Sequence, residues 1–325
     1  MNILVTGGAG FIGSNLVEAL LQDERVSRVR VLDNFATGKQ RNITAFSKDP
    51  KFELLEGDIR DYQTCLKACD GIDRITHQAA LGSVPRSIKD PLTTNAVNIS
   101  GTLNIFTAAK EKQVDRIVYA ASSSTYGDSK TLPKVEGQIG KPLSPYAITK
   151  YVNELYADVF HQLYGTDFVG LRYFNIFGPK QDPHGAYAAV IPLFFAKAIR
   201  HEPPTINGDG SFSRDFTYVA NAVQANIRSL FTKKQEALNQ VYNIAVGERT
   251  TLLELWTSIK SITKTPVDVI HGPERKGDVP HSLADITKAR KLLYYQDIVP
   301  LEEGLARAFK WYEQQRVDEK NVAAS

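Results

Sequence analysis

The chain has 325 residues, of which 42% are hydrophobic and 23% charged, and its formal net charge is +3. This composition is typical of a globular protein with a sizeable core, and the length suits two domains. The charges are close to balanced and form no basic stripe, so we do not expect a nucleic-acid partner. No apolar run reaches the roughly 18 residues of a transmembrane helix, so we expect no membrane span.

The start of the chain and its cysteines indicate a compartment. The first predicted strand begins at residue 2, so we expect no signal peptide. Cys65 and Cys69 lie four residues apart in a helical stretch, where we expect neither a disulfide nor a metal site. These features favour the reducing cytoplasm.

A β-branched apolar run, Asn2 to Thr6, leads into three glycines spaced three apart, Gly7, Gly10 and Gly13, and then into a helical pattern. Gly7 allows a tight turn out of the strand, Gly10 lets a pyrophosphate approach the backbone, and Gly13 lets the helix pack closely on the sheet. The helix N-terminus would direct free N–H groups and its positive dipole end at the phosphates. The pattern therefore predicts a dinucleotide-binding turn.

An acidic residue, Asp33, ends the second apolar run, twenty residues beyond Gly13. A carboxylate at this point can accept hydrogen bonds from both ribose hydroxyls and would repel a 2′-phosphate. NAD is therefore favoured over NADP. Lys39 and Arg41 follow closely in the sequence and keep the phosphorylated cofactor open as an alternative.

Apolar strand-like runs alternate with amphipathic helical stretches through the first half of the chain. We predict strands near residues 2–6, 28–32, 52–56, 73–77, 115–120 and 167–173, with helices between them, one of them near 92–111. This alternation predicts an α/β fold, with a doubly wound parallel sheet covered by helices on both faces. Ligands bind such sheets at the carboxyl ends of the strands, so residues that follow strands are the candidates for function.

Two Tyr-x-x-x-Lys pairs occur, Tyr126 with Lys130 and Tyr146 with Lys150, and about one is expected by chance. Turn residues follow Tyr126 directly, so the first pair would not share a helix face. The second pair follows a Ser-Pro helix start within a long helical pattern. Tyr146 and Lys150 would therefore stack on one helix face.

The stacked pair suits proton transfer. A free tyrosine has a pKa near 10 and is a poor base at neutral pH. A neighbouring ammonium, a positive nicotinamide ring and the helix N-terminus would each favour the phenolate of Tyr146, which could then remove a proton from a substrate hydroxyl while hydride leaves the same carbon. Ser122 and Ser123 follow strand 115–120 and could bond a substrate oxygen at the same edge. The alternative is a surface tyrosine above a surface lysine.

The regular alternation ends after the sixth strand, where several prolines separate shorter elements. We predict a smaller second α/β domain there, and a return to the first domain through helix 218–231 and strand 240–244. The predicted division is a dinucleotide-binding domain (1–175, with the return of 218–245) and a substrate domain (176–325). A last helix, about 301–315, would end in a solvated tail, 317–325.

The motifs together resemble the extended short-chain dehydrogenase/reductase superfamily. The resemblance is carried by the three glycines, Asp33, the Ser122–Gly127 segment, Tyr146 with Lys150, and Leu171-Arg172-Tyr173-Phe174-Asn175. Within the superfamily the chain is most similar to UDP-hexose 4-epimerases, particularly those acting on N-acetylated sugars, from residue 2 to about 315. The resemblance implies a Rossmann fold, an NAD cofactor, a UDP-sugar substrate and a homodimer formed by two helices of each subunit, for which 92–111 and 146–164 are candidates.

The resemblance also implies the roles of individual residues. The catalytic set would be Tyr146, Lys150 and Ser122, with Ser123 assisting. The cofactor contacts would be Gly7, Gly10, Phe11, Ile12, Gly13, Asp33, Asn34, Asp58, Ile59, Ala79, Ala80, Asn98, Tyr146, Lys150 and Tyr173. The substrate contacts would be Ser83, Arg86, Ser122, Asn175, Ala189, Val190, Arg214, Arg275, Asp278 and Ser282. Both Arg214 and Arg275 are candidates for the diphosphate, because a guanidinium fork matches phosphate oxygens. We leave out His77, which fits a packed strand end, and His281, which has no evident partner.

The family pattern favours epimerisation over related chemistry. Dehydratases of this type carry Asp-Glu just after the strand-end hydroxyl, and decarboxylases carry a Glu nearby, whereas this chain has Ser123-Ser124. Tyr146 would remove the C4 hydroxyl proton while C4 gives its hydride to NAD⁺, and the 4-keto sugar would turn over before hydride returns to its other face. The alternatives are a decarboxylase or dehydratase on the same scaffold, or a non-catalytic NAD-binding regulator.

Ser282 bears on the choice of sugar. Epimerases limited to plain glucose and galactose typically carry a large tyrosine at this position of the family pattern. A serine leaves room for a 2-acetamido group. The resemblance therefore predicts interconversion of UDP-GlcNAc and UDP-GalNAc, with the UDP-Glc/UDP-Gal pair as weaker substrates.

Overall fold

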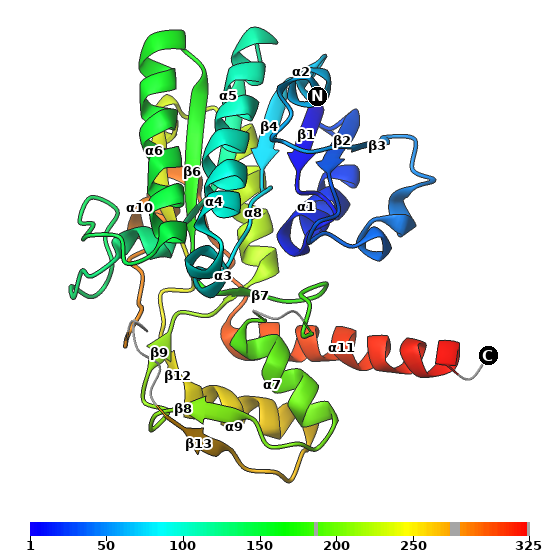
Figure 1. The fold of residues 1–325 in the computed structure, drawn as a ribbon, viewed down its shortest axis with the longest axis vertical. Helices are drawn as coiled ribbons and strands as arrows, with labels where there is room; N and C mark the ends of the chain where they lie inside the picture. The colour runs from blue at the N-terminus through cyan, green and yellow to red at the C-terminus, as the bar shows by residue number, and fades with distance from the viewer. Residues whose placement is uncertain (185–187, 274–279, 324–325) are drawn as a thin grey trace.

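A sheet of seven parallel strands forms the larger part of the computed structural model, which describes residues 1–184, 188–273 and 280–323 (Figure 1). The strands are β1 (Asn2–Thr6), β2 (Arg28–Asp33), β3 (Phe52–Glu56), β4 (Arg74–His77), β5 (Arg116–Ser122), β6 (Asp167–Tyr173) and β11 (Gln240–Ile244). Their order is β11-β6-β5-β4-β1-β2-β3, and every neighbouring pair is parallel. All seven lie within two residues of the predicted bounds, and the strand predicted at 240–244 joins this sheet beside β6.

Helices cover both faces of the sheet. One face packs against α1 (Phe11–Leu21), α8 (Val219–Phe231) and α10 (Thr287–Leu293), and the other against α2 (Tyr62–Cys69), α5 (Thr102–Glu111) and α6 (Pro145–Tyr164). Successive residues of a strand point to opposite faces, so Ile3 and Val5 lie in the first core and Leu4 in the second. The doubly wound fold predicted from the alternation is confirmed.

Short helical segments connect β4 to α5 and β5 to α6. They are α3 (Val84–Lys89), α4 (Pro91–Asn95), the π-helical turn η3 (Ala96–Gly101) and the 3-10 turn η4 (Ser123–Tyr126). Three further 3-10 turns are η1 (Gln40–Asn42), η2 (Thr44–Phe46) and η5 (Gln235–Ala237). The helix predicted near 92–111 thus forms from α4, η3 and α5 in succession.

The smaller part lies below the sheet in Figure 1 and has its own apolar core. It contains β7 (Ile176–Phe177), α7 (Val190–Ile199), β8 (Thr205–Asn207), β9 (Ser213–Arg214), β10 (Thr217–Tyr218), β12 (Thr250–Thr251), α9 (Leu252–Thr263), β13 (Ile270–Gly272) and α11 (Leu301–Ala323). The strands pair as β10-β7, β12-β9 and β13-β8. Phe11 and Ile12, at the start of α1, pack against this core, so the two parts meet at the first turn of the dinucleotide motif.

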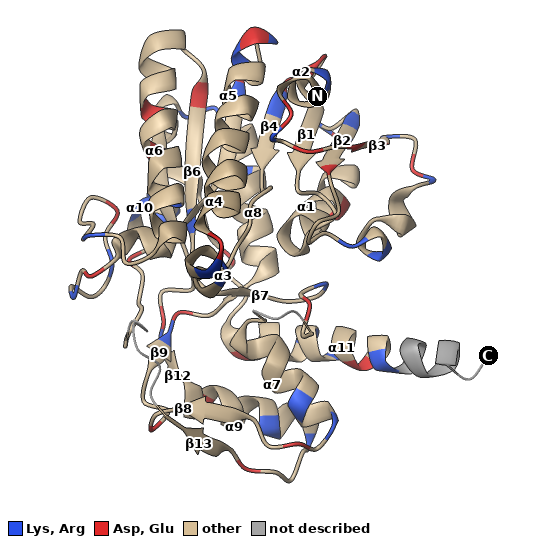
Figure 2. Cartoon of the chain, in the orientation of Figure 1, with Lys and Arg blue, Asp and Glu red and all other residues tan. Residues whose placement is uncertain are grey.

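The final helix is longer than predicted. It continues to Ala323, whereas the sequence analysis ended it near residue 315 with a solvated tail. No glycine or proline follows Gly304, so nothing in the sequence breaks the helix. Basic and acidic residues are interspersed along the ribbon (Figure 2). Among the helices of the described residues, none is both long and apolar enough to cross a bilayer.

Candidate active site

The turn between β1 and α1 is built around its glycines. Gly7 adopts a left-handed conformation (φ +69°), and its amide donates to the carbonyl of Leu32, 2.8 Å away. A Cβ on Gly13 would lie 2.1 Å from the Gly7 carbonyl oxygen, so the first turn of α1 packs on the loop itself. The N-cap of α1, Gly10, makes no side-chain hydrogen bond to the first turn of the helix and lines the cavity. The first N–H groups of the helix are therefore available to an anion.

A cavity of about 600 Å³ opens beside this turn, at the carboxyl ends of the central strands. Its volume lies in the range of small-molecule sites. The predicted site residues that line it are Gly7, Gly10, Phe11, Ile12, Gly13, Asp33, Asn34, Asp58, Ile59, Ala79, Ala80, Ser83, Ser122, Tyr146, Lys150, Tyr173, Asn175 and Ala189. Most of them come from the carboxyl ends of six strands, β1 to β6, which the parallel sheet brings to one edge, while Tyr146 and Lys150 come from α6 and Ala189 caps α7.

Asp33 is fixed at the end of β2 by backbone amides. Its Oδ2 accepts from Ala9 N–H at 2.8 Å and its Oδ1 from Phe35 N–H at 2.9 Å. Burial raises the pKa of this carboxyl group, while the two amides act in the opposite direction. Each oxygen keeps a lone pair for a further donor, which suits two adjacent ribose hydroxyls.

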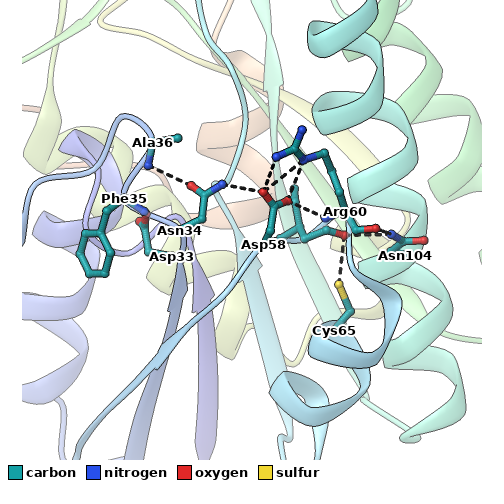
Figure 3. A network of polar contacts seen from close by, with 9 residues as sticks. Asp33, Asn34, Phe35, Ala36, Asp58, Arg60, Cys65 and Asn104 are labelled. Carbon is teal, nitrogen blue, oxygen red and sulfur yellow. Dashed lines mark hydrogen bonds and ion pairs between the residues drawn. The ribbon is translucent and has the colours of Figure 1, made fainter.

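A second acidic residue extends this rim to the end of β3. Asn34 Nδ2 donates to Asp58 Oδ2 at 2.8 Å, and Arg60 pairs with the same carboxylate at 2.7 Å (Figure 3). The Arg60 guanidinium holds the pKa of Asp58 down at about 2. The Asn34 amide also accepts from Ala36 N–H at 3.0 Å, so this part of the cavity wall is tied across two strands.

The proposed catalytic side chains meet where β5 and α6 approach each other. Ser144 caps α6 by accepting from Ala147 N–H at 3.1 Å, as the Ser-Pro pattern predicts. Tyr146 and Lys150 follow on the same helix face, and Ser122 ends β5. The Lys150 ammonium donates to the Ala120 carbonyl at 2.8 Å, which ties the helix to the strand.

Burial governs the ionisation of this group. It lowers the pKa of Lys150 to about 8 and raises the pKa of Tyr146, although a hydrogen bond with Ser122 partly offsets the second effect. The sequence analysis expected the lysine to favour the phenolate. In the protein alone, burial is the larger influence on the Tyr146 pKa and the Ser122 hydrogen bond opposes it, because the tyrosine hydroxyl is removed from water.

Several predicted residues do not line the cavity. Ser123 lies in η4, next to Ser122 but outside the lining. Asn98 is fully buried beneath the cavity wall. Its amide accepts from Leu81 N–H at 2.8 Å and donates to Leu81 O at 3.1 Å, so Asn98 holds the cavity residue Leu81 in place and does not form the wall itself. Arg86 lies within α3 and Val190 is the first residue of α7, and both are outside the lining.

Arg214 and Ser282 come together on a different segment. The Arg214 guanidinium donates to the carbonyls of Ser213 and Pro280, at 3.0 and 3.1 Å. The amide of Ser282 donates to Ser213 O at 3.0 Å. These two predicted substrate residues are thus neighbours in the smaller part, beyond the cavity lining. Arg275 and Asp278 lie outside the described residues.

Two glutamines of the wall were missed by the sequence analysis. Gln78 directly follows β4, so the rule that functional residues follow strands could have found it. Gln181 lies in the proline-rich segment after β7 and carries no sequence signal. Its Oε1 is buried without a hydrogen-bond partner among the described residues, which makes it a free acceptor for a ligand. Two histidines were left out of the prediction. His77 is buried and bonded to Thr6 and Thr102, whereas His281, for which no partner was expected, bonds to Ser213 Oγ through its Nδ1 at 2.9 Å.

Comparisons with known proteins agree with this geometry. The sequence model of the NAD dependent epimerase/dehydratase family matches residues 3–245. A putative UDP-glucose 4-epimerase of Methanocaldococcus jannaschii is 38% identical over 311 residues, which are 95% of this chain and 97% of that protein.

Solved structures extend the comparison to the fold. The UDP-N-acetylglucosamine 4-epimerase of Methanobrevibacter ruminantium, in complex with UDP-N-acetylmuramic acid, superposes with a TM-score of 0.91 at 39% identity, covering 97% of this chain and 98% of that one. A dTDP-glucose 4,6-dehydratase of Streptomyces venezuelae, solved with NAD, superposes with a TM-score of 0.90 at 30% identity, covering 97% and 98%. The same scaffold therefore serves more than one sugar-nucleotide reaction.

The cofactor of the family, NAD, fits the residues present. The uncapped start of α1 suits a pyrophosphate, the anchored carboxylate of Asp33 suits unphosphorylated ribose, and the orphan oxygen of Gln181 can accept a ligand N–H or O–H. The matched family model spans most of the chain, including every strand of the larger sheet. The chain belongs to the NAD dependent epimerase/dehydratase family.

Proposed function

We propose that the protein is a UDP-sugar 4-epimerase whose preferred pair is UDP-GlcNAc and UDP-GalNAc. The observation that carries this proposal is the composition of the wall around Ser122, Tyr146 and Lys150. The carboxylates that line the cavity among the described residues are Asp33 and Asp58. They lie at β2 and β3, and β2 is three strand spacings, about 14 Å, from β5. Within the described part of the chain, the reacting end thus holds the Tyr146 hydroxyl as its acid–base group and no carboxylate for a further proton transfer.

The residues then divide the chemistry as follows. Tyr146, hydrogen-bonded to Ser122, takes the proton of the C4 hydroxyl and later returns it. The Lys150 ammonium donates a hydrogen bond to the Ala120 carbonyl on β5, and this bond holds the lysine side chain in one position. Bound NAD supplies a hydride acceptor that becomes the donor for the return step. No net oxidation remains, so one cofactor serves many turnovers.

The preference for acetylated sugars is supported by two observations. Ser282 offers a small side chain beside Arg214, a candidate for the diphosphate. The M. ruminantium enzyme named above is a UDP-N-acetylglucosamine 4-epimerase, and it is 39% identical to this chain. The M. jannaschii relative is named for UDP-glucose, so the plain hexose pair is the alternative for this site.

We also propose that the protein is a homodimer. One face of α6 exposes four apolar side chains, namely Ile148, Leu155, Val159 and Leu163, each between 46% and 67% exposed. Leu92, on the adjacent helix α4, is 83% exposed. A contiguous apolar face of this kind is typical of a subunit interface.

One incubation tests the function directly. Purified protein is given UDP-GlcNAc without added NAD, and the products are separated by chromatography and followed by NMR. We expect the C4 epimer to appear. Loss of water or carbon dioxide from the sugar would identify a dehydratase or decarboxylase, and an unchanged substrate together with tightly bound NAD would favour a regulator.

A further inference from the structure

A buried amide from the second half of the chain reaches the cavity wall. Asn226 lies on α8, which packs against β4, β5 and β6, and its side chain is completely buried. It contacts Gln78, which follows β4, and Tyr173, which ends β6. Both of these residues line the cavity, whereas Asn226 does not.

The three side chains form a closed ring of hydrogen bonds. Asn226 Nδ2 donates to Tyr173 Oη at 2.7 Å, the Tyr173 hydroxyl donates to Gln78 Oε1 at 3.1 Å, and Gln78 Nε2 donates to Asn226 Oδ1 at 3.1 Å. The second amide proton of Asn226 goes to Ala222 O at 2.8 Å, and its oxygen also accepts from Thr76 Oγ1 at 3.0 Å. All four positions of the Asn226 amide are therefore used.

Because all four positions of the Asn226 amide are used, the direction of each hydrogen bond in the ring is fixed. An inverted Asn226 amide would turn its NH₂ toward Thr76 Oγ1 and the NH₂ group of Gln78, and its oxygen toward the Ala222 carbonyl. Two acceptors would then face each other, and two donors would meet at Gln78. The ring of hydrogen bonds thus has one stable arrangement. It holds the aromatic side chain of Tyr173 and the amide of Gln78 in one orientation toward the cavity.

The same bonds exclude Tyr173 from acid–base work. Its hydroxyl already donates to Gln78, and burial raises its pKa to about 12. Tyr173 ends β6 and Gln78 directly follows β4, and these strands lie on either side of β5, which ends at Ser122. They therefore form the wall at the reacting end of the cavity, opposite the ribose-binding end at Asp33.

We propose that Asn226 is a positioning residue for the cofactor: through the Tyr173–Gln78 ring it fixes the wall against which the nicotinamide end of NAD is retained. It acts through these two residues and touches neither cofactor nor substrate. A dinucleotide site whose sequence motifs all lie in the first 175 residues would then also depend on a side chain of α8, in the segment predicted to return to that domain. This proposal concerns cofactor retention and is independent of which sugar the protein epimerises.

The experiment compares Asn226→Leu with Asn221→Leu. Asn221 lies on the same helix and is equally buried, and its side chain bonds twice to the backbone of Val299, which is not part of the described cavity lining. The measurements are the NAD content of the purified protein, the NAD Kd of stripped protein by calorimetry, and the Tm. We expect both variants to lower the Tm, but only Asn226→Leu to lose NAD on purification and to bind it about tenfold or more weakly.

A second readout separates positioning from general destabilisation. Excess NAD should restore turnover of Asn226→Leu, while the KM for the UDP-sugar stays close to that of the unchanged protein. Equal NAD affinity in the two variants would overturn the proposal. If Asn226→Leu does not fold, Tyr173→Phe decides the question. This variant keeps the aromatic side chain in the cavity wall but removes the hydroxyl that closes the ring of hydrogen bonds. A folded Tyr173→Phe protein with unchanged NAD affinity would also overturn it.

Discussion

Lys150 donates its ammonium proton to the backbone carbonyl of Ala120, two residues before Ser122. This hydrogen bond thus fixes the position of α6 relative to the end of β5. It thereby also fixes the position of Tyr146 relative to the Ser122 hydroxyl. Lys150 as a whole is only 4% exposed, and burial lowers the pKa of its ammonium group to about 8. The pair is therefore held by geometry before any ligand enters.

The first prediction concerns the acid–base tyrosine. Tyr146→Phe removes the hydroxyl that exchanges the C4 proton, and we expect kcat to fall by about 10²–10⁴. The ring remains, so NAD content should be unchanged. Steady-state rates on UDP-GlcNAc and extraction of bound NAD measure the two effects.

The other Tyr-x-x-x-Lys pair of the sequence, Tyr126 with Lys130, provides the control. Tyr126 is buried and donates to Asn243 Oδ1 at 2.6 Å, outside the cavity. Tyr126→Phe should cost about 1 kcal/mol of stability and leave kcat nearly unchanged. A comparable loss of kcat in both variants would contradict the role given to Tyr146.

The sequence located these residues because their signals are local. Asp33, Ser122 and Asn175 each follow a strand, and the direction of a parallel sheet alone brings them to one edge. Tyr146 and Lys150 share one helix, so their spacing fixes their relation. Strand bounds were equally accessible, since each buried strand is a short apolar run between turn residues.

Contacts between distant segments were not accessible in this way. Gln78 and Asn226 are 148 positions apart in the sequence, and the residues around each of them do not predict that the two side chains are in contact. Arg214 and Ser282 are brought near each other only because residues 280–282 lie alongside β9, and a strand of two residues is too short to show a sequence periodicity. Asn98 turns inward within the π-helical turn η3, a distortion that helical spacing does not foresee.

A further prediction addresses cofactor choice. Asp33→Asn keeps the shape but removes the charge that favours two ribose hydroxyls, so NAD affinity should fall by about 10- to 100-fold. The penalty against NADP should shrink, because no carboxylate then faces the 2′-phosphate. Calorimetric titration of stripped protein with each cofactor gives the ratio.

A nearby carboxylate outside the cavity serves as the comparison. Asp61 caps α2 and is exposed, and asparagine is an equally good cap. Asp61→Asn should therefore leave both affinities unchanged. An Asp33→Asn protein that still selects NAD as strongly as before would show that another residue sets the preference.

Sugar choice is tested at Ser282. Ser282→Tyr adds a large ring beside Arg214, so we expect kcat/KM for UDP-GlcNAc to drop well over tenfold while turnover of UDP-glucose survives. The two substrates are assayed in parallel with the same preparation. An equal change for both would remove the steric argument, and Ser282→Ala, which keeps the space, should preserve the original preference.

The proposed dimer is tested on α6. Leu155→Lys places a charge in the centre of the exposed apolar face, and desolvating that charge in the interface should shift the protein to the mass of a monomer. Light scattering after size-exclusion chromatography measures the mass. Leu193→Lys, at a 41% exposed site on α7, is the matched control and should leave the mass unchanged. Identical masses for all three proteins would place the interface elsewhere or exclude it.

The last prediction concerns acid stability and His77. Burial, with a smaller contribution from Lys150, lowers the pKa of this histidine to about 3, so the folded protein keeps the ring neutral while the unfolded chain binds a proton near pH 6.5. Its contribution to stability is fully present above pH 6.5 and is lost as the pH falls toward 3. Linkage gives a loss of about 2 kcal/mol between pH 7 and pH 5.

Replacing the histidine should remove this part of the pH dependence. His77→Gln can still bond the Thr6 and Thr102 hydroxyls but does not titrate, so its free energy of unfolding should change less between pH 7 and pH 5 than that of the unchanged protein, by about 2 kcal/mol. Urea titrations at the two pH values measure it, with the exposed His271→Gln as control. The same pH dependence in both variants would mean that His77 takes up its proton in the folded protein, and that burial does not hold the ring neutral.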